Sequence, residues 1–261
     1  LKGWQTNLKL STNRSNGNTE IYTTRNYYTW KTAGFEGYAS KSSRNTQSDQ
    51  LEATSRYEST FGYNHRLSAL IGYSYQYDKF ESLNASNYDF PTDAYLFNNL
   101  YAGAALKNKE KPDGGMGSDA QDSKLIGFFG RVSYGFKDKY NILASVRYEG
   151  SSKFGANHKW GMFPAISGGW TISGEEFMKN VTAITNLKLR AGYGVTGIIA
   201  GENYRSLVMY DYNTSSWGYY LNSNGQWVSS LEAVSNPNPN LKWEKSAEFN
   251  IGVDFGMLGD R

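Results

Sequence analysis

Apolar and polar residues alternate one by one along several segments of this chain. In the segment 140–149, every second residue is aromatic or aliphatic, and the residues between them, apart from Leu143, are polar or charged. The same pattern recurs at 67–78, 187–196 and 247–255. Successive side chains of a β-strand point to opposite faces, so a period of two predicts strands with one apolar and one polar face.

Weaker alternation at four further segments brings the expected number of strands to about eight. These segments are 4–11, 51–61, 124–136 and 162–172. Most of the eight are near the ~9–11 residues that a tilted strand needs to cross a bilayer. No apolar run approaches the ~18 residues of a spanning helix, so a membrane protein built from this sequence must be a closed barrel.

The connections between the expected strands alternate between short and long. Residues 137–139 and 62–66 form two tight turns, whereas the segments 12–49, 79–123, 151–161 and 197–245 are long and polar. The connection 174–186 lies on the short-turn side and has room for one helical turn. Outer-membrane barrels have tight periplasmic turns and long extracellular loops. We therefore predict an all-β, antiparallel transmembrane β-barrel, although a soluble sandwich also shows alternation.

Composition agrees with strands that have two unlike faces. Aromatic residues make up 16% of the chain, with 21 Tyr, 13 Phe and 7 Trp, yet hydrophobic residues make up only 39%. A net charge of +3 without a basic stripe gives no indication of nucleic-acid binding. The chain has no Cys, which excludes disulfides and thiolate chemistry within it.

Aromatic residues cluster near the expected strand ends, where barrels carry girdles of rings at the two membrane interfaces. One group adjoins the short turns, and another adjoins the long loops. The first group is Phe61, Tyr134, Phe136, Tyr140 and Phe255, and the second is Tyr75, Tyr77 and Tyr148.

Several motifs that could carry chemistry have simpler interpretations. Gly192, Gly194 and Gly197 match a dinucleotide fingerprint but lie within an expected strand, not before a helix. The segment 113–122 has three carboxylates among glycines, a composition that can bind calcium, but its spacing is not that of an EF-hand. The two histidines, at 65 and 158, lie in different kinds of connection, and the side chains of the adjacent acids at 175 and 176 diverge. We therefore assign no catalytic residue, cofactor or metal site, and expect no enzyme.

The long segment 197–245 is rich in aromatic residues set among Asn, Ser and Gly. Aromatic faces beside amides and hydroxyls can hold a sugar ring, an extended peptide or a protein partner, although the rings could equally pack the loop onto its neighbours. The candidate residues for contact with substrate or partner are Tyr204, Tyr210, Tyr212, Trp217, Tyr219, Tyr220 and Trp227.

Four stretches, in order along the chain, resemble the SusC/RagA-type TonB-dependent outer-membrane transporters of Bacteroidota. They are YDFPTDAYLFNNLYAG at 88–103, GSSKFGANHKWGMFPAISGGWTISGEEF at 150–177, LKLRAGYGVTG at 187–197 and NPNLKWEKSAEFNIGVDFG at 238–256. Complete members of this family have a barrel of roughly 22 strands with an N-terminal plug domain. The resemblance implies that residues 1–261 are an internal segment of that barrel, with the plug domain and the TonB box outside this chain.

The resemblance also implies a function and partners. It implies the wall of an importer in the bacterial outer membrane, surrounded by lipid, which takes up oligosaccharides or peptides with a SusD-like surface lipoprotein and draws energy through TonB. The alternatives are a self-contained outer-membrane barrel of another kind, such as an enzyme or adhesin, and a soluble carbohydrate-binding β-sandwich. Under the importer interpretation, six charged residues face the lumen and contact the plug or solvate the passage: Arg147, Glu149, Lys188, Arg190, Glu248 and Asp254.

Overall fold

The computed structural model describes residues 3–108, 115–199, 201–212, 219–233 and 235–257. The chain divides into two compact units. The first unit contains Leu1–Leu10, Gln50–Gln76 and Ser123–Arg261, and the second contains Ser11–Asp49 and Tyr77–Asp122. Strands β1 to β4 contribute residues to both units.

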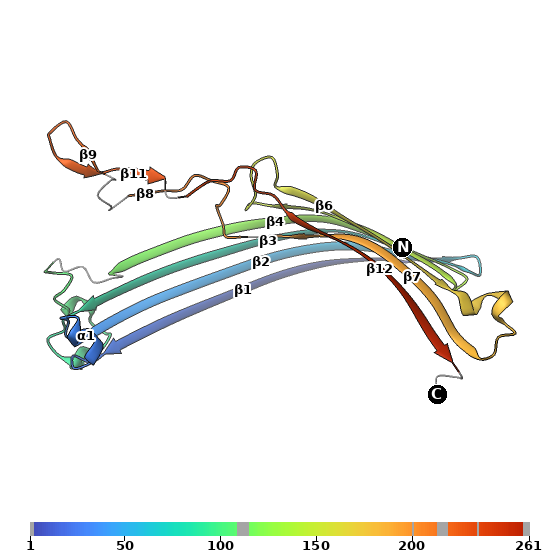
Figure 1. Cartoon of the computed structure of the whole chain (residues 1–261), viewed down its shortest axis with the longest axis horizontal. Helices are drawn as coiled ribbons and strands as arrows, with labels where there is room; N and C mark the ends of the chain where they lie inside the picture. Colours follow the sequence, from blue (N-terminus) through green and yellow to red (C-terminus); the bar gives the residue numbers. More distant parts are fainter. Residues whose placement is uncertain (1–2, 109–114, 200, 213–218, 234, 258–261) are drawn as a thin grey trace. The chain divides into compact units, whose positions relative to one another are not determined.

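Eight strands form one sheet with neighbours in chain order (Figure 1). They are β1 (Trp4–Thr23), β2 (Tyr38–Phe61), β3 (His65–Tyr88), β4 (Met116–Phe136), β5 (Tyr140–Ser151), β6 (Trp160–Thr171), β7 (Ile184–Ile198) and β12 (Glu244–Met257). The antiparallel register is continuous from β4 to β12, for example Val132 opposite Ala144 and Gly192 opposite Asn250. Strands β1 and β12 form the two edges, so the sheet of the described residues is open. The predicted fold class and strand number are confirmed.

The two tight turns form where they were predicted. Lys137 and Asp138 both have positive φ, and the N–H of Lys139 donates to the carbonyl oxygen of Phe136 at 3.0 Å. This is the geometry of a type I′ turn, whose twist matches that of the flanking strands. The N–H of Lys137 also donates to the carbonyl oxygen of Asn64, at 2.8 Å, in the turn between β2 and β3. The two short turns therefore lie side by side on the same side of the sheet.

Two of the predicted long loops are shorter than expected, because four strands continue beyond their predicted ends. Strand β1 extends to Thr23 and β2 begins at Tyr38, so the connection predicted at 12–49 shrinks to 24–37. Strand β3 continues to Tyr88 and β4 begins at Met116, which shortens the connection predicted at 79–123 in the same way. The added residues are mostly polar and show no regular alternation, so period-two hydrophobicity could not mark them as strand.

The remaining connections contain short elements. The helix α1 (Tyr28–Thr32) follows β1, and the 3₁₀ turns η1 (Asp93–Tyr95) and η2 (Leu100–Ala102) follow β3. The turns η3 (Ile172–Gly174) and η4 (Glu176–Met178) lie in the connection where a helical turn was predicted. Two small hairpins pair β8 (Tyr210–Tyr212) with β11 (Leu231–Ala233) and β9 (Tyr219–Leu221) with β10 (Trp227–Ser229). No helix of the described residues is long and apolar enough to cross a membrane.

Each unit has a small core in which residues of the connections pack against residues of the strands. In the first unit, Phe154, Phe163 and Trp243 are buried against one another. In the second unit, Tyr88 and Phe90 are buried, and Asn87 is buried between them and the following loop. The Asn87 amide donates to the carbonyl oxygens of Leu100 and Gly103, so it closes that loop from within.

Candidate functional site

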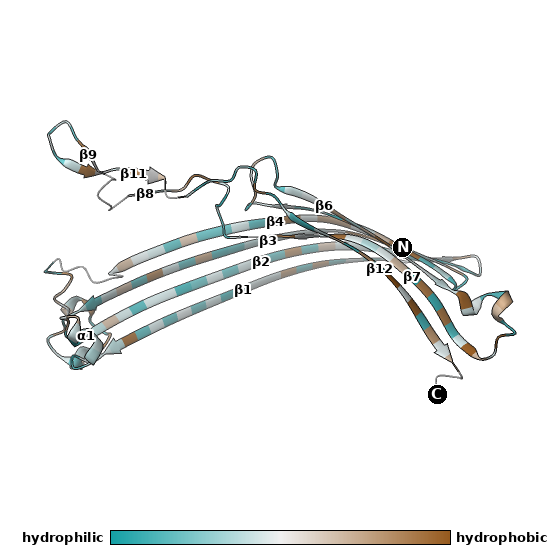
Figure 2. Ribbon diagram, viewed as in Figure 1, coloured by the Kyte–Doolittle hydropathy of each residue, from teal (hydrophilic) through white to brown (hydrophobic). Residues whose placement is uncertain are grey.

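The apolar side chains of the strands lie on an exposed surface. Ile142 and Val146 of β5 are 53% and 42% exposed, and Ile251 and Val253 of β12 are 67% and 61% exposed. Figure 2 shows the resulting alternation of hydrophobic and hydrophilic residues along β7 and β12. We call this side, which carries Tyr140, Ile142 and Val146, the outer face. A sandwich would bury these residues against a second sheet, so their exposure excludes the soluble alternative.

A row of aromatic rings crosses the outer face beside the short turns. It runs through Phe61, His65, Phe136, Tyr140 and Trp170, with successive ring centroids 5.1, 4.8, 6.2 and 6.4 Å apart. His65 Nδ1 also lies 2.7 Å from the hydroxyl of Tyr134. Three of the predicted girdle residues, Phe61, Phe136 and Tyr140, are members of this row.

A second row of rings crosses the outer face near the long connections. Phe128 lies 5.3 Å from Tyr73 and 6.2 Å from Trp160, and Trp160 stacks on Tyr148 at 4.8 Å. Tyr148 was predicted for this girdle, whereas Tyr73, Phe128 and Trp160 were not. Their membership depends on the register between strands, which sequence alone does not give.

The spacing of the two rows matches the apolar part of a membrane. Tyr140 and Tyr148 stand eight residues apart on β5, as do Phe128 and Phe136 on β4. Eight residues span roughly 27 Å of strand, or about 20 Å along the membrane normal at a tilt of ~40°. The outer face between the rows is therefore a hydrocarbon-facing band, and the strand residues beyond the second row lie outside it.

The opposite, inner face is polar and contains many small residues. Arg147 pairs with the buried carboxylate of Glu149 at 2.5 Å, and Arg190 of β7 pairs with Asp254 of β12 at 2.6 Å. Gly192 also lies on this face, and a Cβ atom added to it would lie 3.2 Å from the side-chain amide oxygen of Asn250. The glycine motif at 192–197 is thus strand, as the sequence indicated. Paired charges among small residues suit a wall that faces water.

Two of the stretches that resemble known transporters pack together in the first unit. The N–H of Gly155 donates to the carbonyl oxygen of Leu241, and the indole N–H of Trp243 donates to that of Lys159, both at 2.9 Å. The ring of Trp243 contacts those of Phe154 and Phe163 at 4.9 and 5.1 Å. A Cβ at Gly155 would overlap the backbone of Pro239, so the close approach requires glycine. These motif residues clamp the 152–159 connection to the segment that enters β12.

Glu175, between η3 and η4, connects the first ring row to its turn. Its carboxylate accepts hydrogen bonds from Tyr140 Oη at 2.5 Å, Lys139 Nζ at 3.0 Å and Trp170 Nε1 at 3.1 Å. These bonds, that from Tyr140 first, lower the pKa of Glu175 to about 2. Its neighbour Glu176 points elsewhere and pairs with Lys179 at 2.6 Å. The two acids therefore diverge, and Glu175 fixes two ring-row side chains in place.

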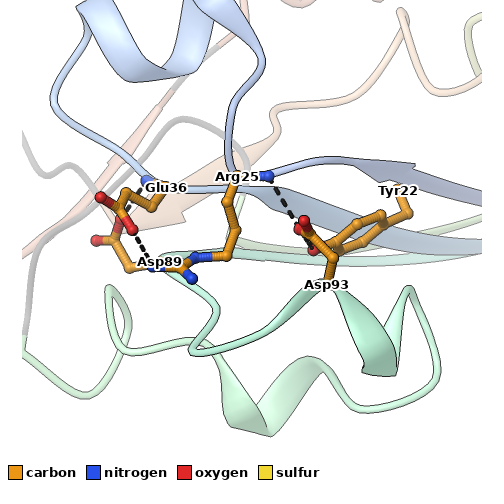
Figure 3. A network of polar contacts seen from close by, with 5 residues as sticks. All are labelled: Tyr22, Arg25, Glu36, Asp89 and Asp93. Atoms are coloured by element: carbon orange, nitrogen blue, oxygen red, sulfur yellow. Dashed lines mark hydrogen bonds and ion pairs between the residues drawn. The ribbon is translucent and has the colours of Figure 1, made fainter.

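A polar network joins the connections of the second unit (Figure 3). Asp93 accepts hydrogen bonds from the Tyr22 hydroxyl at 2.5 Å and from the Arg25 N–H at 3.0 Å. The Arg25 guanidinium pairs with Glu36, whose N–H donates to Asp89 at 2.7 Å. Burial and the bond to Asp93 raise the pKa of Tyr22 to about 12, and the Tyr22 bond lowers that of Asp93. The network ties residues 22–36 to residues 89–93.

The aromatic candidates of the segment 197–245 do not form one site in the described residues. Tyr210 lies on β8, and Trp227 lies on β10 of the other hairpin; both are exposed. Tyr204 has a positive φ and lines a cleft with Arg205 and Asn238. Tyr212 lies on β8 and both Tyr219 and Tyr220 lie on β9, whereas Trp217 lies outside the described residues. Their role in binding stays a prediction.

The candidate metal residues are scattered. Asp113 lies outside the described residues, and Asp119 and Asp122 lie in β4. His158 lies in the 152–159 connection, away from the ring row that holds His65. Among the described residues, no three His, Asp or Glu side chains form a group that could hold a metal ion.

A model of the family "TonB dependent receptor-like, beta-barrel" matches residues 2–261. The chain belongs to this family. The resemblance inferred from the motifs is confirmed, and so is the location in the bacterial outer membrane, where these barrels lie. The family match therefore identifies the sheet described above as part of a TonB-dependent receptor barrel.

Three relatives that are named TonB-dependent receptors support the same family assignment. TonB-dependent receptor P39 of Formosa agariphila is 36% identical over 214 residues, which cover 81% of this chain and 19% of the relative. TonB-dependent receptor P26 of the same organism is 34% identical over 229 residues, covering 87% of this chain and 22% of the relative. TonB-dependent receptor SusC of Bacteroides thetaiotaomicron is 36% identical over 143 residues, covering 54% of this chain and 14% of SusC. The chain thus spans about a fifth, or less, of the length of these relatives.

Solved structures share the fold. The RagAB peptide transporter matches all of this chain and 27% of its own chain, with a TM-score of 0.83 and 23% sequence identity. The RagAB peptide importer in its open-open state matches with a TM-score of 0.82 and 24% identity, again over all of this chain and 27% of its own.

Proposed function

We propose that this chain forms part of the barrel wall of a TonB-dependent outer-membrane importer. The observation that carries this proposal is the two-faced sheet, with a hydrocarbon-facing band between two ring rows and paired charges on the opposite face. Such a wall separates lipid from a wet lumen. The plug domain, the TonB box and the remaining strands belong, in this proposal, to parts of the protein outside residues 1–261.

The inner face and the loops have different tasks in this function. Lys188, Glu248 and the Arg147–Glu149 and Arg190–Asp254 pairs contact the plug or solvate the passage. Of the predicted contact residues, Tyr204 lies in a loop, and Tyr210 and Trp227 lie in the small hairpins of the same long connection. There they meet substrate or a SusD-like surface lipoprotein. The lipoprotein partner follows from the resemblance to SusC/RagA-type transporters, which the name SusC among the relatives and RagAB among the structures supports.

The substrate class is an oligosaccharide or a peptide. The structural neighbour named a peptide transporter supports peptides. Aromatic rings set among amides and hydroxyls suit either class. The relatives reported above are named TonB-dependent receptors. We therefore propose transport without catalysis.

Uptake by the native bacterium tests this function. Removing the gene of the complete protein should abolish growth on one of two nutrient classes, either defined oligosaccharides or defined oligopeptides. Growth on the corresponding free monomers should continue. Removing TonB should have the same effect. In a complemented strain, Trp227→Ala and Tyr210→Ala should slow uptake, whereas the lipid-facing Phe249→Leu should not. A tagged transporter should also co-purify with a surface lipoprotein. Unchanged growth on both classes would contradict the proposal.

A further inference from the structure

A shallow furrow crosses the outer face of five neighbouring strands, β1 to β5. Its floor consists of small residues, Thr6, Ala53, Ser55 and Gly130. Most outward positions around it carry larger side chains, including Ile71, which is 67% exposed. Five strands at ~4.8 Å spacing give the furrow a length of roughly 19 Å.

The furrow lies at the depth of hydrocarbon. Tyr73, Phe128 and Tyr148, which belong to the second ring row, form one rim. From that rim the furrow extends into the band between the two rows, past Val146. An occupant at this depth must be apolar, because no water is available there to solvate polar groups.

Gly130 leaves space that the fold does not require. Its φ is not positive, and the atom nearest to its Cβ position, the backbone oxygen of Leu70, is 3.8 Å away. Neither a turn nor a close approach therefore calls for glycine, and glycine within a strand costs about 0.5–1 kcal/mol relative to alanine. By contrast, Gly72 on the inner face is covered by the ring of Phe129.

The lining is uncharged and carries one polar feature. No Lys, Arg, Asp or Glu is among the residues that line the furrow. The hydroxyls of Thr6 and Ser55 lie 3.3 Å apart, so one donates to the other. The pair has one hydroxyl hydrogen left over, which an ester or amide carbonyl at the head of an acyl chain can accept.

We propose that the furrow binds one fatty acyl chain of a bilayer lipid and recognises the chain without its headgroup. The furrow runs across the strands, so at their tilt of ~40° its length covers roughly 12 Å along the membrane normal, which fits within the ~15 Å of one leaflet's hydrocarbon. A flexible chain fills a shallow groove with dispersion contacts that a flat wall would not offer. An uncharged lining has no group to distinguish one phosphate headgroup from another, so binding follows the chain.

Native mass spectrometry of the complete transporter tests this inference. Gly130→Leu fills the furrow floor, and Gly168→Leu is the matched control. Gly168 lies on the outer face of β6, the atom nearest to its Cβ position is also 3.8 Å away, and it does not line the furrow. Wild type and Gly168→Leu should each retain one more lipid than Gly130→Leu, whose lipid affinity should fall roughly tenfold. Heat-modifiable migration in gels should show that all three are folded.

Two further arms separate the alternatives. Phosphatidylethanolamine and phosphatidylglycerol with identical chains should be retained equally; a strong preference for one would overturn recognition by the chain alone. Equal lipid counts in wild type and Gly130→Leu, or an equal loss in Gly168→Leu, would overturn the site itself. If Gly130→Leu instead converts a dimer to a monomer without changing the lipid count, the furrow holds a second copy of the protein and the proposal fails.

Discussion

At the scale of single residues, the side chains that matter most here are those that hold an interface in place. Glu175 accepts three hydrogen bonds, two of them from rings of the first row. Gly155 allows two loop segments to touch, and Gly130 leaves a gap in the outer wall. In sequence, all three look ordinary. Their roles follow from what the sheet register places opposite them.

Replacing Glu175 with glutamine should remove a pH-dependent part of the stability. Its pKa is about 2 in the folded protein and about 4.5 when unfolded, so the native state favours the ionised form. This stabilisation is fully present above pH 4.5 and is lost as the pH falls towards 2. Urea unfolding of the complete protein in detergent should therefore show Glu175→Gln less stable than wild type at pH 7.

The same measurement at low pH tests the direction in which the stability difference changes with pH. The difference between Glu175→Gln and wild type should shrink between pH 4.5 and 2. Glu176→Gln is the control, because its carboxylate contacts one Lys179 side chain and both are well exposed; its effect should be small at every pH. A difference for Glu175→Gln that stays constant with pH would contradict the hydrogen-bonded carboxylate.

At the scale of elements, a strand can be predicted from alternation only where its two faces meet different surroundings. Within the band, one face meets hydrocarbon and the other meets water, so apolar and polar residues alternate along each strand. This alternation predicted the strands. Beyond the second ring row, both faces of β1 to β4 are largely polar, and the pattern disappears although the strands continue. The tight turns were predictable because the strands on both sides of each turn show the alternation of apolar and polar residues. The Glu175 contacts were not, because they join three segments through register.

The turn at 137–139 has residues that suit it poorly. Lys137 and Asp138 both adopt positive φ, which favours Asn and Gly at these two positions. Lys137→Asn combined with Asp138→Gly should raise the stability by about 1 kcal/mol, since it relieves the left-handed backbone strain. The lost Arg66–Asp138 pair is exposed and contributes little. A shift of the urea midpoint checks this, and Lys137→Val, with a β-branched side chain, should shift the midpoint the other way.

The two faces of β4 should respond oppositely to charge. Val132 lies on the outer face, midway between Phe128 and Phe136 of the two ring rows, and is 47% exposed. Val132→Arg should destabilise the barrel by about 2–4 kcal/mol because it places a cation in hydrocarbon. Ser133→Arg, on the inner face beside it, should cost much less. Folding efficiency into lipid vesicles measures both, and equal losses would contradict the assignment of the faces.

At the scale of the whole molecule, the open sheet explains why the wall cannot be understood in isolation. Strands β1 and β12 pair on one side only among the described residues. In lipid, an unpaired strand edge leaves backbone N–H and C=O groups without partners, at a cost of several kcal/mol each. The relatives are about four times as long, which is enough to supply further strands. We therefore propose that the band, the lumen and the furrow are properties of a closed barrel to which this chain contributes one sector.

Residues 1–261 produced alone should therefore fail to form a stable monomer, with or without detergent. In water, Phe249, Ile251 and Val253 would be exposed and drive aggregation; in detergent, the two strand edges would still seek partners. Size-exclusion chromatography with light scattering should show aggregates or oligomers, while the complete protein runs as a folded barrel with heat-modifiable migration. Eight strands are enough to close a small barrel, so the test is a real one. A monodisperse, soluble and folded monomer would mean that the outer face is covered by protein, not by lipid, and the importer wall would have to be abandoned.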